Sequence, residues 1–254
     1  MIEPRTGADG SRADNRVPRR RTEKISEAVA REIVHDMRGM SAGSKLAPEA
    51  VMLETYRVGR ASLREALRLL EVQGLIVIRP GPGGGPVVAS VDSVHFARMT
   101  SLYFHFSGVT YQNLIEARLV MEPVMARLAA ERRAPEHIEQ LERFIAGGDE
   151  DGDAAYYRHG TEFHSVIAAA SGNPLLDLTA RSIKDLYTDR LEGGLVFGAD
   201  VRERVHGAHT AIAKAIVVGN AKRAEKLMYD HMVEFLEFVS RSRPEVLSEV
   251  VDWR

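Results

Sequence analysis

Apolar residues recur every three or four positions along most of this chain, and that spacing predicts amphipathic helices. Two short β-branched runs, separated by a stretch of glycine and proline, interrupt the pattern once. The elements expected in the first third are helices over residues 22–37, 48–55 and 60–73, followed by strands over 75–78 and 87–89. This order predicts a winged helix-turn-helix with a small β wing over residues 22–89.

The rest of the chain has no strand-like alternation and predicts consecutive helices. Glycine, asparagine and proline separate them at short intervals, which favours antiparallel neighbours in a bundle. The expected helices cover residues 95–106, 111–131, 135–147, 153–171, 174–191, 199–218 and 221–241. The fold class is therefore mainly α, with the winged head followed by an antiparallel all-α bundle over residues 95–242.

Three segments lie outside these two predicted domains. Residues 1–21 contain almost no large apolar residues and are interpreted as a disordered basic tail. Residues 90–94 are expected to be a linker, and residues 243–254 a C-terminal tail.

Composition narrows the class of protein only slightly. The 254 residues include no cysteine, which excludes disulfides and thiol chemistry. No apolar run is long enough to cross a membrane, and the N-terminus lacks a secretory signal, so a cytoplasmic protein is expected. Residues 1–89 carry 15 Lys and Arg against 11 Asp and Glu, whereas the rest carries 19 against 25. A basic front on an acidic body fits DNA contact at the front.

The third helix of the head has the pattern of a DNA-reading helix. Arg60, Arg64 and Arg68 are spaced by four and share one face, while leucines occupy another. Arginine reaches phosphates and guanine edges in the major groove. The alternative is a solvated helix in which Arg64 pairs with a nearby glutamate. A wing rich in glycine favours DNA contact, because a backbone without side chains can approach a groove closely.

The stretch Leu46 to Ala89 resembles the winged-helix domain of the GntR family of bacterial regulators. The matching residues are Leu46, Glu49, Val58, Arg60, Leu63, Arg64, Glu65, Ala66, Leu67, Leu70, Glu71, Gly74 and Leu75. The resemblance implies DNA contacts at Arg60, Ser62 and Arg64 and at the wing residues Gly83 and Gly84. Two positions depart from the family pattern, because Ala50 stands where a DNA-contacting arginine is usual and Gly59 where a serine is usual.

Three histidines, His164, His209 and His231, fall on helices expected to face the core of the bundle. A buried histidine is more often a hydrogen-bonded core residue than a metal ligand. These segments, however, also resemble the FCD body of the FadR subfamily over residues 95–240. That resemblance implies a divalent metal such as zinc, held by one aspartate and three histidines. The aspartate position, four residues before the first histidine, is Gly160 here.

The missing carboxylate leaves three alternatives. The three imidazoles can hold a metal together with water or an effector. Another side chain, Thr161 or His206, can replace the aspartate. Finally, the site can be free of metal and bind an anionic effector directly. Loss of a carboxylate makes the site more cationic, which favours a carboxylate effector.

Two further residues are candidates for binding the effector. Arg118 lies in the middle of a mostly apolar helix and either pairs with Glu116 or Glu122 or points into a cavity. The resemblance implies that it binds the effector's carboxylate. Asn173 resembles a family asparagine near the cavity, or it caps the helix that begins at Pro174.

The predicted function is a ligand-responsive bacterial transcriptional regulator, a repressor that binds a palindromic operator as a homodimer. Its expected partners are double-stranded DNA and a small carboxylate or fatty-acid-like effector, with no membrane. One alternative is a metal-free regulator that responds to a fatty acid or acyl-CoA. A remote alternative is a metal-dependent hydrolase, but no general-base carboxylate stands at a recognisable spacing, so the chain is not expected to be an enzyme.

Overall fold

The computed structural model describes residues 23–81, 83–90, 92–146, 153–191, 195 and 198–253. Side chains are described for all of these except residues 153–159, 161 and 189. The chain divides into two compact units, Met1–Val91 and Asp92–Arg254, called here the head and the body. The predicted tail over residues 1–21 lies outside the described residues.

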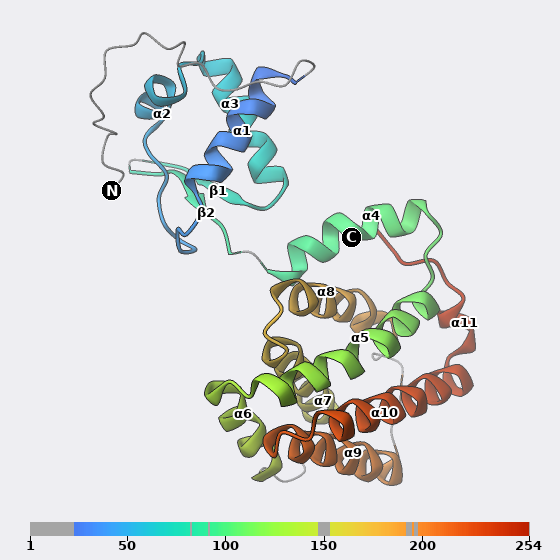
Figure 1. Cartoon of the computed structure of the whole chain (residues 1–254). Coiled ribbons are helices and arrows are strands. Elements are labelled where there is room, and N and C mark those ends of the chain that lie inside the picture. Colours follow the sequence, from blue (N-terminus) through green and yellow to red (C-terminus); the bar gives the residue numbers. More distant parts are fainter. Residues whose placement is uncertain are drawn as a thin grey trace. The chain divides into compact units, whose positions relative to one another are not determined.

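The head has the predicted order of elements. Its helices are α1 (Ile25–Asp36), α2 (Glu49–Tyr56) and α3 (Arg60–Val72), and its strands are β1 (Ile76–Arg79) and β2 (Gly85–Val88) (Figure 1). The two strands pair antiparallel, with Ile76 opposite Val88 and Arg79 opposite Gly85. One apolar core joins the three helices and β1 through Val29, Ile33, Met52, Leu63, Leu67, Leu70 and Ile76. The winged helix-turn-helix is confirmed.

The turn of the wing requires glycine. A Cβ on Gly84 would lie 2.2 Å from the carbonyl oxygen of Arg79 and 2.9 Å from that of Gly81. The backbone N–H of Gly84 donates to the Gly81 carbonyl at 2.9 Å, which closes the turn. The ammonium group of Lys45 donates to the carbonyl of Gly83 at 2.8 Å and ties the wing to the segment before α2.

The named elements in the described part of the body are all helices. Its helices are α4 (Ser93–Phe106), α5 (Tyr111–Arg132), α6 (Pro135–Ala146), α7 (Asp153–Ala170), α8 (Pro174–Leu191), α9 (Ala199–Val217), α10 (Ala221–Ser242) and α11 (Pro244–Leu247). The predicted mainly α fold, with an all-α C-terminal part, is confirmed. No helix in the described part of the chain has the length and apolar character needed to cross a membrane.

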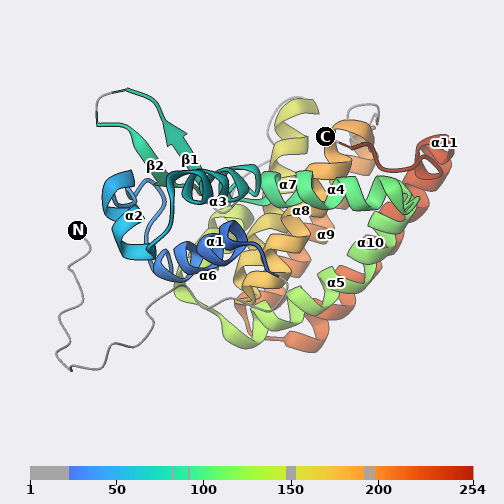
Figure 2. The same ribbon diagram turned by 90° about the horizontal axis from the view of Figure 1, so that it is seen from above.

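Helices α5 and α10 run side by side and antiparallel through the body (Figures 1 and 2). The start of α5 meets the end of the chain, because Tyr111 donates its backbone N–H to the Glu249 carbonyl at 3.1 Å. At the opposite end, the turn before α10 approaches the end of α5, since a Cβ on Gly219 would lie 3.6 Å from the Ala130 carbonyl oxygen. Two apolar clusters fill the bundle, one around Phe163 and Met228 and the other around Tyr111 and Tyr187.

The structure corrects the two ends of the predicted body. Residues 90–94 were expected to be a linker, but α4 begins at Ser93, because the Asp92 carboxylate accepts the backbone N–H of His95 at 2.9 Å and caps the helix. Residues 243–254 were expected to be a tail. They contain α11 instead, and Val246, Leu247 and Val251 are buried in the second apolar cluster.

The start of α4 is fixed to α8. The hydroxyl of Ser93 donates to the carboxylate of Asp185, and the hydroxyl of Ser182 lies 3.1 Å from the carbonyl oxygen of Ser93. These contacts join the first helical residue of the body to the middle of a helix that lies 89 to 92 residues later in the sequence.

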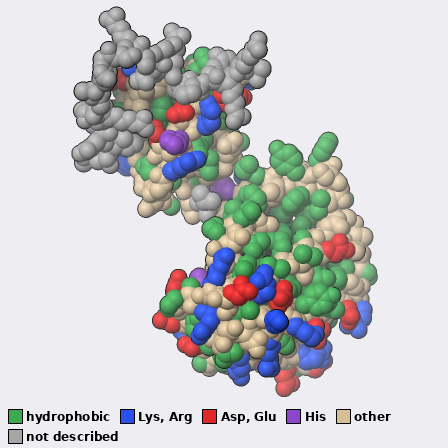
Figure 3. Space-filling model, in the orientation of Figure 1, with side chains coloured by type: hydrophobic (Ala, Val, Ile, Leu, Met, Phe, Trp, Pro, Cys, Tyr) green, Lys and Arg blue, Asp and Glu red, His purple; other side chains and the backbone are tan. Residues whose placement is uncertain are grey.

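One face of α4 exposes a stripe of large apolar side chains. Met99, Leu102, Tyr103 and Phe106 stand at positions i, i+3, i+4 and i+7 and so share one side of the helix. Their exposed fractions run from 45% for Met99 to 90% for Phe106. Hydrophobic side chains also gather over this part of the body in the space-filling view (Figure 3). We refer to these four residues as the α4 stripe.

Candidate functional site

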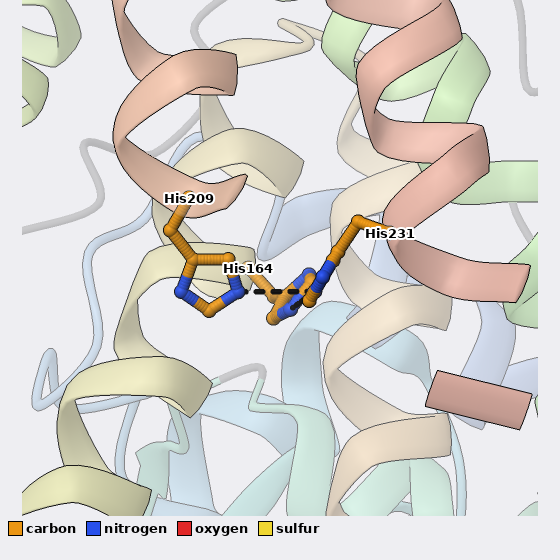
Figure 4. Close-up of side chains that lie close together, drawn as sticks. All are labelled: His164, His209 and His231. Atoms are coloured by element: carbon orange, nitrogen blue, oxygen red, sulfur yellow. Dashed lines mark hydrogen bonds between the residues drawn. The ribbon is translucent and has the colours of Figure 1, made fainter. Parts of the chain in front are cut away.

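Three histidines from three helices meet inside the body (Figure 4). His164 lies on α7, His209 on α9 and His231 on α10, and one nitrogen of each ring lies within 4.8 Å of the other two. Nε2 of His231 lies 3.0 Å from Nε2 of His209 and 3.3 Å from Nε2 of His164. His209 and His231 are buried, and His164 is partly buried. The structure therefore brings together the three histidines that the sequence singled out. We refer to them as the histidine cluster.

A buried glutamate on α5 orients one of these rings. The carboxylate of Glu122 accepts a hydrogen bond from Nδ1 of His164 and, through its other oxygen, one from Nε of Arg118 at 2.6 Å. A neutral His164 with its proton on Nδ1 has a free lone pair on Nε2, the nitrogen that faces the cluster. A carboxylate behind a histidine is the usual arrangement around a histidine that ligates a metal.

The three facing nitrogens cannot all be satisfied by protons. Nε2 of His231 contacts Nε2 of both His209 and His164, but it carries either one N–H or one lone pair. It can therefore form a linear hydrogen bond with one of these two nitrogens and not with both. A divalent cation replaces both contacts by bonds to nitrogen lone pairs. Three imidazoles form a usual donor set for zinc and related metals, so the residues present fit a metal ion.

The electrostatics of the cluster favour a neutral His231 near a charged Glu122 carboxylate. Burial, together with the nearby positive charges of His164 and Arg118, lowers the pKa of His231 to about 3. Burial alone would raise the pKa of Glu122, but the charges of Arg118 and His164 and their hydrogen bonds bring it down to about 2. The uncharged imidazole is the form that binds a metal.

Gly160, one turn before His164 on α7, faces the cluster. A Cβ built on this glycine would lie 3.8 Å from the Cε1 atom of His209, an ordinary contact distance, and this is its one contact within 4 Å among the described residues outside the adjoining turns of α7. The position where the family resemblance expects an aspartate is therefore directed at the cluster but supplies no side chain. Of the suggested replacements, the side chain of Thr161 lies outside the described residues. His206 packs against Phe144, with ring centroids 6.2 Å apart, and does not belong to the group that could hold a metal.

A small pocket with a charged lining adjoins the cluster at His164. It is lined by Arg118, Glu122, His164, Ser165, Ala168, Ala180, Arg181 and Lys184. Two roles were considered for Arg118, an ion pair and a place in a cavity, and the structure shows both. Arg118 pairs with Glu122 and also lines the cavity. Its guanidinium lies 4.7 Å from the ring centroid of Tyr187 and 5.4 Å from that of Phe235, so its place is well defined.

Asn173 lies elsewhere. Its side-chain carbonyl accepts the backbone N–H of Leu175 at 3.1 Å and that of Leu176 at 3.5 Å, at the start of α8. Asn173 is absent from the lining of the cavity. The structure thus places it in the second of the two roles considered for it, the helix cap.

The predicted DNA-contacting residues lie on α3 and the wing. Arg60 and Arg64 are exposed, whereas Ser62 points to a different side of the helix and is partly buried. Nε of Arg64 lies 3.3 Å from the Glu49 carboxylate, with the two side chains 70% and 39% exposed. A pair so open to water contributes little and leaves Arg64 free to exchange partners. Gly83 and Gly84 lie at the tip of the wing, in the turn between β1 and β2.

Sequence reasoning did not foresee three parts of the site. The sequence offered Glu122 as one possible partner of Arg118, but did not indicate its contact with His164, which lies 42 residues away. It did not identify Lys184 or Arg181, which resemble ordinary solvated residues of an amphipathic helix. The available signal was that both stand one turn apart on the helix that follows the His164 segment.

Two family models match the chain. The model described as "Bacterial regulatory proteins, gntR family" matches residues 25–84, which is the head, and the model described as "FCD domain" matches residues 113–234, which is most of the body.

Similar proteins are bacterial regulators. The chain is 31% identical over 159 residues to the "HTH-type transcriptional repressor NanR" of Shigella sonnei, and the match spans 60% of each protein. It is 28% identical over 218 residues to the "Uncharacterized HTH-type transcriptional regulator YcbG" of Bacillus subtilis, spanning 85% of this chain and 88% of that one. A solved structure named "Streptococcus agalactiae GntR" is 25% identical, superposes with a TM-score of 0.63, and covers 84% of this chain and 99% of that chain. The chain therefore belongs to the GntR family of bacterial regulatory proteins and combines its winged helix-turn-helix with an FCD domain, as the FadR subfamily does.

Proposed function

We propose that this protein is a cytoplasmic transcriptional repressor that binds a palindromic operator as a homodimer and is regulated by a small carboxylate. The observation that carries the proposal is the convergence of three Nε2 atoms in the body, next to a cavity lined by charged side chains. The head supplies Arg60 and Arg64 on an exposed helix face, together with a glycine-rich wing. The effector favours one arrangement of the body and so changes the spacing of two heads on the operator.

His164, His209 and His231 would hold a divalent metal, with zinc the simplest candidate. When bound, the metal supplies a Lewis-acidic position for an oxygen of the effector. Glu122 keeps His164 in the tautomer that presents Nε2, and Arg118 holds Glu122 ionised. Gly160 contributes no carboxylate, so the protein leaves a coordination position for the effector's own carboxylate.

The lining of the pocket and the partners of Glu122 argue against the two alternative functions. A pocket with five ionisable residues among the eight that line it is too polar for a fatty acyl chain. A hydrolase needs a general base beside the metal. Glu122 is the carboxylate nearest to the cluster in the described part of the chain, and Arg118 and His164 already occupy it. A non-enzymatic regulator fits better.

The α4 stripe supports the homodimer. Four large apolar side chains on one helix face form the kind of surface that a second helix covers. A second copy of this chain is the occupant we propose, because a palindromic operator requires two heads.

Fluorescence anisotropy with labelled DNA from the protein's own promoter, compared with a shuffled sequence of the same length, tests the proposal. We expect binding that prefers the promoter, and release by small carboxylates from zinc-loaded protein only. The variant His209→Ala should bind the promoter normally and fail to respond. Release by acyl-CoA from metal-free protein would support the metal-free alternative instead. Equal affinity for both DNAs would contradict the proposal as a whole.

A further inference from the structure

The turn between the two helices of the helix-turn-helix contains an arginine in an uncommon backbone conformation. Arg57 directly follows α2 and has φ 50° and ψ 49°, the left-handed region that favours glycine. Its backbone N–H donates to the carbonyl of Leu53 and closes the end of the helix. The turn needs this conformation but does not need an arginine, because glycine or asparagine adopts it at a lower cost.

The described part of the chain contains one other non-glycine residue with a positive φ, and it is also an arginine. Arg133 directly follows α5 with φ 50° and ψ 46°, and its backbone N–H donates to the Ala129 carbonyl. Its side chain lies beside the turn before α10, because its Cδ would be 3.2 Å from a Cβ built on Gly219. Packing inside the body therefore accounts for a long side chain at Arg133.

The side chain of Arg57 has no such role within the protein. It is exposed, and its guanidinium forms no ion pair or hydrogen bond with the residues that the structure describes. A residue that occupies an unfavourable backbone conformation without a contact of its own is a candidate for a contact with another molecule.

The position of Arg57 in the head fits a contact with a DNA phosphate. In a helix-turn-helix the first helix crosses the phosphate backbone and the second begins in the major groove. Arg57 stands between them, three residues before Arg60 at the start of α3, so the two Cα atoms are at most about 11 Å apart. The major groove is about 12 Å wide, so its bordering phosphates come within reach of the Arg57 side chain when Arg60 enters the groove.

The surrounding sequence supplies no other cation for this contact. Residues 46–59 contain two glutamates, Glu49 and Glu54, and Arg57 is the one basic residue in that stretch. Helix α2 itself carries no lysine or arginine. Affinity for duplex DNA depends on the phosphates that lysine and arginine neutralise, so a cation at the end of this helix compensates for its two carboxylates.

We propose that Arg57 binds a phosphate of the operator backbone beside the groove that α3 enters. The inference rests on the DNA-binding part of the proposed function. The ligand is the sugar-phosphate backbone of duplex DNA, which a guanidinium binds with two parallel hydrogen bonds. Because a phosphate contact reads no base, it strengthens binding to every sequence equally.

The salt dependence of DNA binding tests this, because each phosphate contact releases counter-ions. The logarithm of the association constant falls with the logarithm of the salt concentration, with a slope of about −0.9 for each phosphate neutralised. Arg57→Asn removes the cation and keeps a residue that accepts the left-handed conformation, so the slope should become less steep by about 0.9. In fluorescence anisotropy, affinity for the labelled promoter fragment should fall about 8-fold in 0.1 M salt and ~4-fold in 0.2 M salt. The shuffled fragment should lose affinity by the same factors.

Three further variants complete the experiment. Arg57→Lys keeps the charge and should retain most of the wild-type slope. Arg133→Asn is the matched control, because it removes the same charge from the same backbone conformation but in the body, and it should bind DNA as wild type does. The thermal midpoint of Arg57→Asn, followed by circular dichroism, should be no lower than that of wild type. Arg57→Gly also accepts the left-handed conformation and repeats the measurement if the asparagine variant unfolds.

The outcomes separate the inference from the proposed function. An unchanged salt slope in Arg57→Asn overturns the inference and leaves the proposed function intact. An equal change of slope in Arg133→Asn attributes the effect to net charge and overturns it as well. A weaker preference for the promoter over the shuffled fragment in Arg57→Asn assigns Arg57 to a base edge and overturns the phosphate contact. If wild-type protein binds neither fragment, the proposed function fails and the inference fails with it.

Discussion

Replacing Gly160 by aspartate should complete the metal site. Among the described residues outside the adjoining turns of α7, the added Cβ would meet only Cε1 of His209, at 3.8 Å, so they leave room for it without a clash. Glycine and aspartate are both poor helix formers, with helix propensities that differ by only about 0.3 kcal/mol. Any large effect of Gly160→Asp therefore comes from the carboxylate and not from the backbone.

The size of the effect follows from the role of the carboxylate. Losing a partner outside the first ligand sphere typically costs about 10- to 100-fold in metal affinity. A carboxylate that binds the metal directly should contribute at least as much, so we expect zinc to bind Gly160→Asp at least ~10-fold more tightly, or about 1.4 kcal/mol. The same change fills the position left for the effector, so the affinity for carboxylates should fall.

Competition with a chromophoric zinc chelator measures the first effect, and calorimetry with the preferred carboxylate measures the second. Gly160→Ala is the control, because it adds the Cβ without the carboxylate and should match wild type in both assays. If Gly160→Asp binds zinc no more tightly than Gly160→Ala, position 160 does not face a metal site and the reasoning is refuted.

Three further predictions concern the core, the α4 stripe and the head. Glu122→Gln leaves the buried charge of Arg118 unpaired and should lower the free energy of unfolding, measured by urea denaturation, by about 3–5 kcal/mol. The control Glu131→Gln breaks the exposed pair with Arg127 at the same i,i+4 spacing and should lower it by less than about 1 kcal/mol. Equal losses in the two variants would contradict the buried pairing. Phe106→Glu places a charge in the α4 stripe and should convert dimers to monomers in sedimentation velocity; an unchanged dimer would locate the interface elsewhere. Arg60→Ala should weaken operator binding by about 1–3 kcal/mol in fluorescence anisotropy if it contacts a base, whereas wild-type affinity would remove it from the interface.

The positions of the helices were predictable because the chain marks their ends locally. Gly108, Pro135, Gly172 and Gly219 interrupt apolar patterns that are otherwise regular, and the structure ends or begins a helix close to each of them. The C-terminal segment was not predictable in the same way. Val246 and Val251 are apolar residues in a short stretch without helical periodicity, and their burial depends on packing against α5 and α10.

The candidate site was only partly predictable. The histidines came from a family resemblance, and nothing in their spacing shows that the three rings meet. The contact between Glu122 and His164 depends on how α5 packs against α7, which no local pattern encodes. Lys184 has the same sequence context as a solvated lysine, and only the arrangement of α7 and α8 around Ser165 sets it apart.

Neighbouring residues on helix α8 contact two different parts of the body, the cavity and the start of α4. Lys184 and Arg181 line the cavity, while Ser182 and Asp185 hold Ser93, which lies two residues beyond the last residue of the head, Val91. A helix moves as a rigid rod, so any shift of α8 that accompanies occupation of the cavity is also a shift of the point where the body begins. The residues that line the cavity and the residues that hold the start of the body then lie on the same helix. A movement of α8 would affect both directly, without a change in the packing of the apolar core.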